Sequence, residues 1–381
     1  YDFVVEDEQA GTFWYHAHSW KQRADGLYGA LIVHKPADVS LPDPQKYGYD
    51  EEQVLLVSDW YHKTASDVLN FNISLKDQGT KLAPESILIN GQGYSSCPKA
   101  MNADSVQCKN VSSPDLSLRG RRIRLRIINS GASAGYIASF TGYALQVITV
   151  DGGNHVETAS MSRSIGILYP GERVDIIVVP FSDGIAGQEP AMSVTLDTED
   201  IEARDLVQRF SINYASHHRE KRQSSDHMNT VTASTDLARL CGPPFAASDS
   251  LPEDADEMIV LYVKTEYSSD TNMPKGLINR TTWGNVSSQK PPLLAMDGPG
   301  RDRVRSLPEV RLVEDEYKWV DIVVNNVDDY GYPFHLHGNS FYVLASHAPE
   351  TESIEPFNSF NHMPPAGKRL NTVDPVTKDT V

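Results

Sequence analysis

The stretch Gly-Thr-Phe-Trp-Tyr-His-Ala-His, residues 11–18, ends an aromatic run with two histidines two positions apart. Aromatic residues and threonine favour β-strands, in which side chains two residues apart share one face, with Cα atoms roughly 6.6 Å apart. A second pair, His335 and His337, follows Tyr-Pro-Phe at residues 332–334. Two such pairs near opposite ends of the chain predict a metal cluster clamped between two domains. Imidazole suits copper, which binds most tightly among the common divalent metals, so copper is the leading prediction.

Short apolar runs recur along the chain and are separated by Gly, Pro, Asn and Asp. This pattern predicts an all-β protein, because it is typical of sandwiches and not of alternating βα units. Helical periodicity is weak throughout. The basic run from Arg119 to Arg126 alternates with apolar residues and predicts the solvated face of a strand. The clearest strand-like runs are residues 30–33, 54–57, 87–89, 123–128, 144–150, 174–179, 192–196, 259–263, 320–324 and 341–344.

The composition sets the broad class of the protein. A chain of 381 residues suits two to three domains, and a hydrophobic content of 40% is enough to build their cores. The formal net charge of −17 argues against nucleic acid as a partner, because phosphate binding needs basic patches. The chain contains no run of 18 apolar residues, so no membrane span is predicted. The first residues have the pattern of a strand and not of a signal peptide.

Glycosylation and cysteine patterns predict an extracellular, secreted glycoprotein. Acceptor patterns occur at residues 72–74, 110–112, 279–281 and 285–287. Cys97 and Cys108 bracket a polar loop and could form a local disulfide bond, which leaves Cys241 without a partner.

Composition shifts predict the domain boundaries. A proline-rich and charged segment, residues 36–50, would link a first unit to a second, and residues 215–256 read as a polar linker. The predicted domains are 1–40, the end of a first sandwich, 50–214, a complete second sandwich, and 257–381, a truncated third. We expect both ends to be cut, because residues 369–381 hold no closing strand signal and the first unit is too short for a sandwich.

Two motifs resemble those of a known family. Residues 11–20, followed by Asp-Gly-Leu-Tyr-Gly-Ala at 25–30, closely resemble the second copper motif of multicopper oxidases, which include laccases, ferroxidases and ascorbate oxidases. Pro-Phe-His-Leu-His-Gly at 333–338 resembles the third copper motif, and the sequence looks most like fungal members. Supporting matches lie at residues 58–62, 87–91, 151–152, 170–175 and 319–326.

The resemblance implies consecutive cupredoxin-like (plastocyanin-like) Greek-key sandwiches, the first and third incomplete. It implies a trinuclear type 2/type 3 copper cluster, in which His16 and His18 bind the type 3 pair, His335 binds type 2 copper and His337 binds a type 3 copper. A type 1 copper would take single electrons from a small-molecule donor such as a phenol, an ascorbate-like reductant or Fe²⁺, and the cluster would reduce O₂ to water. No catalytic residue beyond the copper ligands is implied, and oligomeric state and donor identity stay open.

The sequence departs from the family pattern in its motif count. The first and last copper motifs, which supply half of the cluster ligands, are absent, and no cysteine stands beside a histidine. We therefore expect a fragment that does not turn over alone.

A second departure concerns electron entry. Tyr332 stands where the family has a type 1 histidine, and a phenol is a poor substitute for neutral imidazole. A non-catalytic copper-binding protein without a type 1 site is therefore the alternative, with His347 as a candidate substitute ligand. Carbohydrate binding is a minor third reading, because we can place no aromatic platform. If iron is the donor, candidate carboxylates are Asp328, Asp329 and Glu350.

Overall fold

The structure is a computed structural model, and its described residues form two compact units. Unit 1 comprises Tyr1–Pro244, Pro333–Leu344 and Asp374–Val381, and unit 2 comprises Phe245–Tyr332 and Ala345–Val373. The described residues are 2, 4–5, 9–18, 21–36, 41–74, 82–94, 111–118, 122–157, 160–181, 188–197, 206–214, 231–245, 250–269, 273–282, 318–328, 331–347 and 370–381.

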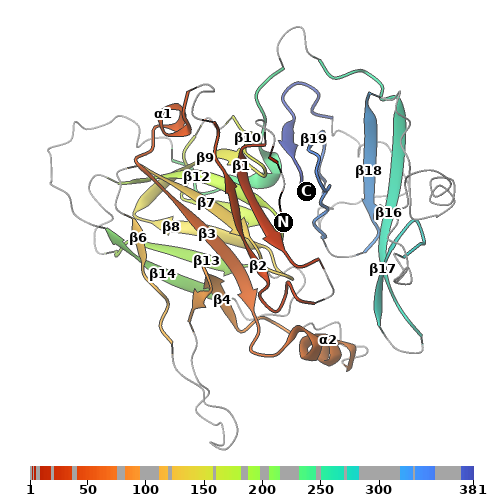
Figure 1. Cartoon of the computed structure of the whole chain (residues 1–381), viewed down its shortest axis with the longest axis horizontal. Coiled ribbons are helices and arrows are strands. Elements are labelled where there is room, and N and C mark those ends of the chain that lie inside the picture. The colour runs from red at the N-terminus through yellow and green to blue at the C-terminus, as the bar shows by residue number, and fades with distance from the viewer. Residues whose placement is uncertain are drawn as a thin grey trace, which may run out of the picture. The chain divides into compact units, whose positions relative to one another are not determined.

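Unit 1 contains a seven-stranded and a six-stranded sheet that lie as two layers (Figure 1). The order of the larger sheet is β10-β9-β12-β7-β3-β4-β5. Its strands are β3 (Glu51–Trp60), β4 (Ser86–Ile89), β5 (Gln92–Gly93), β7 (Ile123–Asn129), β9 (Tyr143–Val150), β10 (Asn154–His155) and β12 (Arg173–Pro180). The order of the smaller sheet is β15-β11-β8-β13-β14-β6. Its strands are β6 (Leu116–Leu118), β8 (Tyr136–Thr141), β11 (Ser164–Leu168), β13 (Ala191–Leu196), β14 (Val207–Tyr214) and β15 (Thr235–Asp236). The prediction of an all-β fold is confirmed.

The core of unit 1 is formed by the apolar runs that the sequence marks as strands. Strand β8 alternates between buried and more exposed positions, as expected for a strand with one face on the core. Strand β7 is buried at every position, because it pairs with β3 and β12 and its other face contacts β1 (Gly11–His16). The core also includes Leu237 and Leu240, which lie in the described part of the predicted polar linker.

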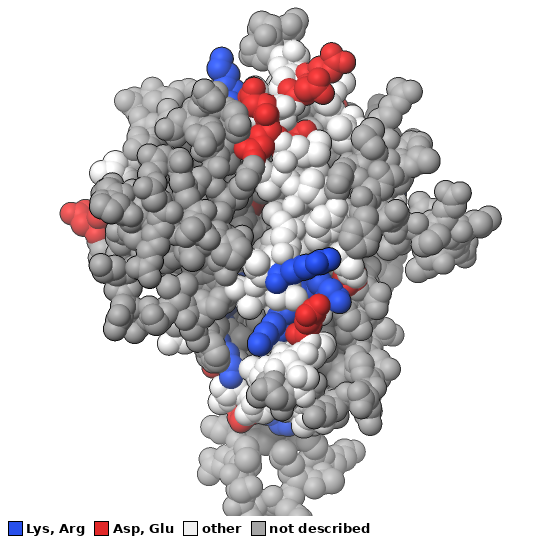
Figure 2. Space-filling model, turned by 90° about the vertical axis from the view of Figure 1, so that its right-hand side faces the viewer, with Lys and Arg blue, Asp and Glu red and all other residues white. Residues whose placement is uncertain are grey.

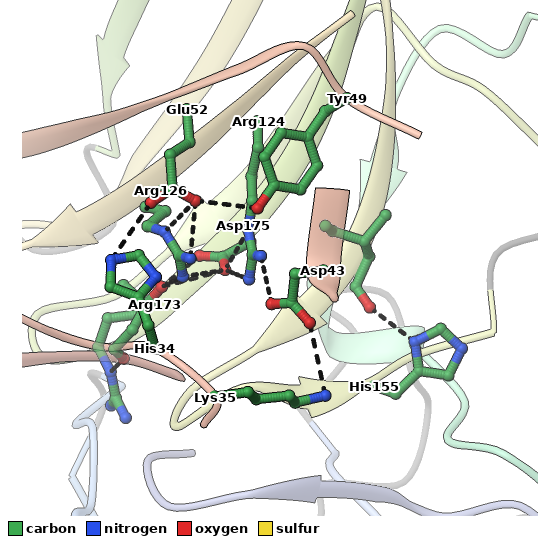
Figure 3. Close-up of polar contacts among 12 residues, drawn as sticks. His34, Lys35, Asp43, Tyr49, Glu52, Arg124, Arg126, His155, Arg173 and Asp175 are labelled. Carbon is green, nitrogen blue, oxygen red and sulfur yellow. Dashed lines mark hydrogen bonds and ion pairs between the residues drawn. The ribbon is translucent and has the colours of Figure 1, made fainter. Parts of the chain in front are cut away.

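The basic run contradicts its sequence interpretation. Arg124 and Arg126 are each only 1% exposed, and both donate to the carboxylate of Asp175 on β12, at 2.5 Å and 3.1 Å. Asp43 and Glu52 complete the network, which Figure 3 shows. The prediction of a solvated strand face was wrong, because β1 covers this face and distant carboxylates pair with the guanidinium groups.

Three short helices interrupt the strands of unit 1 in its described part. They are α1 (Asp43–Tyr47), α2 (Ala65–Ser74) and the 3₁₀ helix η2 (Leu237–Arg239). Helix α1 lies in the predicted link of residues 36–50, and its first turn supplies Asp43 to the arginine network. Among the described residues, no helix is long and apolar enough to cross a membrane.

Two small strand pairs of unit 1 contain or adjoin the predicted metal ligands. Strand β1 pairs antiparallel with β2 (Tyr28–Val33), so that His16 lies opposite Tyr28. Strand β19 (Phe341–Val343) pairs antiparallel with β20 (Val376–Lys378). Just after β20, Thr380 forms an isolated bridge with His335.

Unit 2 has a three-stranded sheet in the order β17-β16-β18, with strands β16 (Glu257–Tyr267), β17 (Pro274–Ile278) and β18 (Val320–Asn326). Strand β16 pairs antiparallel with β17 and parallel with β18.

On the described part of the face in Figure 2, basic side chains gather in one area and acidic ones mainly in another, with uncharged surface between them. Both signs therefore occur on that face.

Some sequence predictions fall on residues outside the described ranges. These include the proposed Cys97–Cys108 disulfide bond, the acceptor residues Asn110 and Asn285, and two of the candidate carboxylates, Asp329 and Glu350. Cys241 is described and is a free, partly buried thiol. The domain boundaries stay a prediction.

Candidate metal centre

The structure brings the four predicted histidines of unit 1 into one group, here called the four-histidine cluster (His16, His18, His335 and His337). The ring centroids of His16 and His18 are 6.0 Å apart, and those of His335 and His337 are 4.7 Å apart. His18 and His337 join the two pairs at 5.3 Å, with their rings edge to face. Residues from opposite ends of the chain therefore meet in one place.

The first pair is held where β1 ends. The ring of His16 packs on the ring of Trp14 with centroids 4.4 Å apart. The guanidinium of Arg23 lies over the same Trp14 ring, 4.9 Å from its centroid. The loop to β2 is closed by a hydrogen bond from the Ala17 amide to the carbonyl of Leu27. The imidazole Nδ1 of His16 lies 3.1 Å from the Ala17 carbonyl oxygen. Because a carbonyl only accepts, this contact requires the proton on Nδ1 and leaves the lone pair on Nε2.

The second pair is held by the segment after β20. Nδ1 of His335 lies 2.8 Å from the carbonyl oxygen of Asp379 and 3.1 Å from the hydroxyl of Thr380. The carbonyl contact again fixes the proton on Nδ1, so that Nε2 of His335 is free to bind a ligand. A backbone carbonyl on the remote nitrogen is a common arrangement behind metal-binding histidines.

Electrostatics favours neutral rings at two of the four positions. Burial lowers the pKa of His16, and the nearby charges of Arg23 and His18 lower it further. Burial also lowers the pKa of His337, together with the charges of His335 and His18. A neutral imidazole keeps the lone pair that metal binding needs.

His335 differs, because hydrogen bonding to the side chain of Asp379 raises its pKa against the effect of burial. Burial opposes ionisation of Asp379, but hydrogen bonds from Arg173 and His335 hold its pKa well below the usual range. The Asp379 carboxylate is therefore charged, and it faces the ring that we expect to bind type 2 copper.

The donor set fits copper in its chemistry, since it is made of imidazole nitrogens with two defined tautomers. The spacing does not form a closed cage. Among the described residues, no three His, Cys, Asp or Glu side chains converge closely enough to hold one metal ion. The four described histidines therefore fit ligands of neighbouring metal ions better than the complete ligand set of a single ion.

Tyr332, the residue in place of the type 1 histidine, lies in unit 2. Its hydroxyl donates to the carboxylate of Asp328 at 3.0 Å and lies 3.2 Å from the hydroxyl of Thr265. Asp328 also accepts from the backbone amide of Thr265 at 2.8 Å. The phenol is therefore part of a hydrogen-bonded group at the end of β16.

Sequence reasoning missed the residues that support the cluster. Asp379 and Thr380 follow β20 in a segment where the sequence shows no closing strand, and Arg173 anchors Asp379 from β12. The only signal was that residues 151–152 and 170–175 match the family. His62, in the family match at residues 58–62, is exposed, and its Nδ1 lies 3.0 Å from a carboxylate oxygen of Glu85.

Comparison with known proteins identifies the family. Three family models described as multicopper oxidase match residues 1–38, 51–214 and 285–381. The chain belongs to the multicopper oxidase family.

Its curated relatives include fungal laccases and iron transport oxidases. Laccase-1 of Cryptococcus neoformans var. neoformans is 27% identical over 364 residues, which cover 90% of this chain and 55% of that protein. The iron transport multicopper oxidase fetC of Epichloe festucae is 29% identical over 354 residues, which cover 90% of this chain and 50% of that protein. The chain thus spans about half the length of these relatives.

Solved structures share the fold. The crystal structure of Fet3p, a multicopper oxidase that functions in iron import, has a TM-score of 0.69 at 19% identity and covers 98% of this chain and 64% of that chain. The laccase from Botrytis aclada has a TM-score of 0.58 at 21% identity and covers 98% of this chain and 62% of that chain. The predicted cupredoxin-like architecture is confirmed.

Proposed function

We propose that His16, His18, His335 and His337 are copper ligands in a type 2/type 3 cluster, and that the whole protein is a copper-dependent oxidase. The observation that carries the proposal is the meeting of both histidine pairs, with centroids of neighbouring rings 4.7–6.0 Å apart. As in the sequence prediction, His16 and His18 serve type 3 copper, His335 type 2 and His337 type 3. Copper bound there would supply the one-electron chemistry that O₂ reduction to water requires.

The chain's own residues prepare the imidazoles for this role. The carbonyls of Ala17 and Asp379 hold protons on Nδ1 of His16 and His335 and leave the lone pair of each neutral ring on Nε2. Burial lowers the pKa of His16 and of His337, which favours their neutral forms. Each effect removes a cost that metal binding would otherwise carry, since a protonated or misoriented imidazole must first lose its proton or turn.

The proposed reaction couples one-electron oxidation of a small donor to reduction of O₂. Phenols, ascorbate-like reductants and Fe²⁺ are the candidate donors, and relatives named as laccases and as iron transport oxidases leave these classes open. Because the chain spans about half the length of those relatives, the activity is proposed for the whole protein. We expect the 381 residues alone not to turn over, since they carry half of the cluster ligands that the family implies.

A second candidate function is copper binding without electron entry. The observation that favours it is the engagement of the Tyr332 hydroxyl by Asp328 and Thr265, which occupies the phenol with hydrogen bonds. In this case the cluster side of the chemistry is kept and the type 1 side is lost.

The copper-loaded whole protein distinguishes these functions. Oxidase function predicts O₂ consumption with at least one of a phenol, ascorbate or Fe²⁺, and a blue copper-thiolate absorption band. A His335→Ala variant should abolish the O₂ consumption. Three or four bound coppers without a blue band or O₂ consumption would overturn the oxidase proposal and support the second function.

The proposed location is extracellular. Asn279, the acceptor residue of one glycosylation pattern, is exposed on the turn after β17, where a glycan can be attached. A loss of mass when the purified protein is treated with an N-glycan-removing enzyme supports this location, and an Asn279→Gln variant assigns the site.

A further inference from the structure

Arg173, on β12 of unit 1, touches both of the segments that carry the histidine pairs. Its Nε donates to the carbonyl of Thr12, four residues before His16 on the same strand, at 3.1 Å. One terminal nitrogen donates to Oδ1 of Asp379 at 2.7 Å, and the other donates to Oδ2. A single guanidinium therefore contacts β1 on one side and the segment that holds His335 on the other.

These contacts are buried, and Asp151 adds further hydrogen bonds to them. Arg173 is 3% exposed and Thr380 is 1% exposed. The carboxylate of Asp151 receives the Arg173 amide at 3.0 Å on Oδ1, and the amides of Asp379 and Thr380 at 3.3 Å on Oδ2. Asp151 and Arg173 thus both bind the segment of Asp379 and Thr380.

The geometry of this arrangement needs arginine. The guanidinium is a rigid fork whose five donors point in fixed directions, whereas the lysine ammonium is a compact group on a flexible stem. A lysine at position 173 would keep the positive charge near Asp379. It would not reach Asp379 and Thr12 together in the same fixed geometry.

We infer that Arg173 is the positioning residue of the four-histidine cluster, which fixes the strand of His16 and the Asp379–Thr380 support of His335 in one arrangement. The inference rests on the proposed function, because fixing the histidines serves metal binding. The contacts of Arg173 themselves are present in the metal-free chain. Asp379 is the link, because its carboxylate is held by Arg173 and its carbonyl accepts from Nδ1 of His335.

The first test uses the metal-free chain and reads the His335 ring by ¹⁵N NMR, with a His335→Gln variant to assign the signal. Wild type should show the proton on Nδ1. Arg173→Lys should give a mixture of tautomers, whereas Arg124→Lys should keep the wild-type signal. Arg124 is the matched control, since it is similarly buried and its hydrogen bonds go to the carboxylates of Asp43 and Asp175, not to Thr12, Asp379 or Thr380. An unchanged His335 signal in folded Arg173→Lys would overturn the inference.

The second test titrates the same proteins with Cu²⁺ and follows binding by electron paramagnetic resonance. Removal of support behind metal-binding histidines typically weakens metal binding about 10- to 100-fold, and we expect this loss in Arg173→Lys and not in Arg124→Lys. Equal loss in both variants would mean a general structural role and would overturn the inference. Absence of Cu²⁺ binding by wild type would instead count against the proposed function, and the NMR result would still decide the role of Arg173.

Asp379→Asn provides a second variant if Arg173→Lys does not fold, as judged by circular dichroism. It keeps the shape of the side chain and the carbonyl that binds His335, but it removes the charge that Arg173 holds. The same tautomer mixture and weaker Cu²⁺ binding are expected. A wild-type His335 signal in Asp379→Asn would contradict the role of the Arg173–Asp379 link.

Discussion

The rings of His18 and His337 lie 5.3 Å apart, edge to face, although the two residues stand near opposite ends of the chain. Neither residue is in a long strand. His18 follows β1, and His337 lies between His335, which bridges to Thr380, and β19. The pairs meet because β1 lies against β7 and β12, while the segment after β20 is anchored to Asp151 and Arg173. The two-layer sandwich of unit 1 therefore positions both halves of the proposed metal centre.

The buried ion pair of Glu172 and Lys378 should be costly to break. Glu172 is 5% exposed and Lys378 is 7% exposed, and the Lys378 ammonium donates to the Glu172 carboxylate. Burial alone would lower the pKa of Lys378, but the charges of Glu172 and Asp151 raise it. Glu172→Gln keeps the size of the side chain and leaves this cation unpaired, so we expect a loss of about 3–5 kcal/mol in the free energy of unfolding by denaturant titration.

The matched control for this pair is the double variant Glu172→Gln with Lys378→Met, which removes both charges. It should recover a large part of the loss, because no unpaired charge remains. A single variant that loses less than about 1 kcal/mol would show that the pair contributes little.

A methyl group at Gly11 should destabilise the start of β1. A Cβ there would overlap the backbone of Gly152, which cannot move aside as a flexible side chain can. Overpacking of this kind typically costs about 1–3 kcal/mol, and we expect Gly11→Ala to lower the thermal unfolding midpoint. Gly276→Ala on β17 is the control, since a Cβ there meets no atom within 4 Å. Equal midpoints for the two variants would contradict the close approach of β1 to Gly152.

The phenol of Tyr61 should ionise late. Burial raises its pKa to about 12 from a usual value of 10.0, and its hydroxyl donates to the carbonyl of Leu82. Because the folded-state pKa lies above the unfolded one, the stability from this group is complete below about pH 10 and is lost as the pH rises toward about 12. Wild type should therefore lose stability more steeply over that range than Tyr61→Phe, as measured by denaturant titration at several pH values. Parallel slopes would contradict the burial of this phenol.

The strands and the metal centre differ in how far the sequence predicts them. Apolar runs such as residues 144–150 and 174–179 predict β9 and β12 because local hydrophobicity decides burial. Strand β14 was missed, because Val207–Tyr214 alternates polar with apolar residues and has no continuous apolar run. Arg124 and Arg126 were misjudged, since their burial depends on Asp175 and on cover from β1, which no local pattern reveals.

The structure brings the four predicted histidines together, and their metal binding stays a prediction, while the residues that support them were not foreseen. His16 and His335 stand out through paired spacing and motif context. Asp379 and Thr380 have no such pattern, and their role arises only because the segment after β20 lies against Asp151 and Arg173. Interactions between distant parts of the chain therefore account for what the sequence did not predict.

The most direct test of the central claim is equilibrium binding of Cu²⁺ to the 381-residue chain, with the ligand atoms identified by electron paramagnetic resonance. We predict nitrogen hyperfine structure from imidazole in wild type, and at least tenfold weaker binding when His335 and His337 are both replaced by alanine. His62→Ala, which removes an imidazole outside the four-histidine cluster, should bind Cu²⁺ as wild type does. Binding that is unchanged in the double variant, or lost equally in His62→Ala, would contradict the assignment of the cluster as the copper centre.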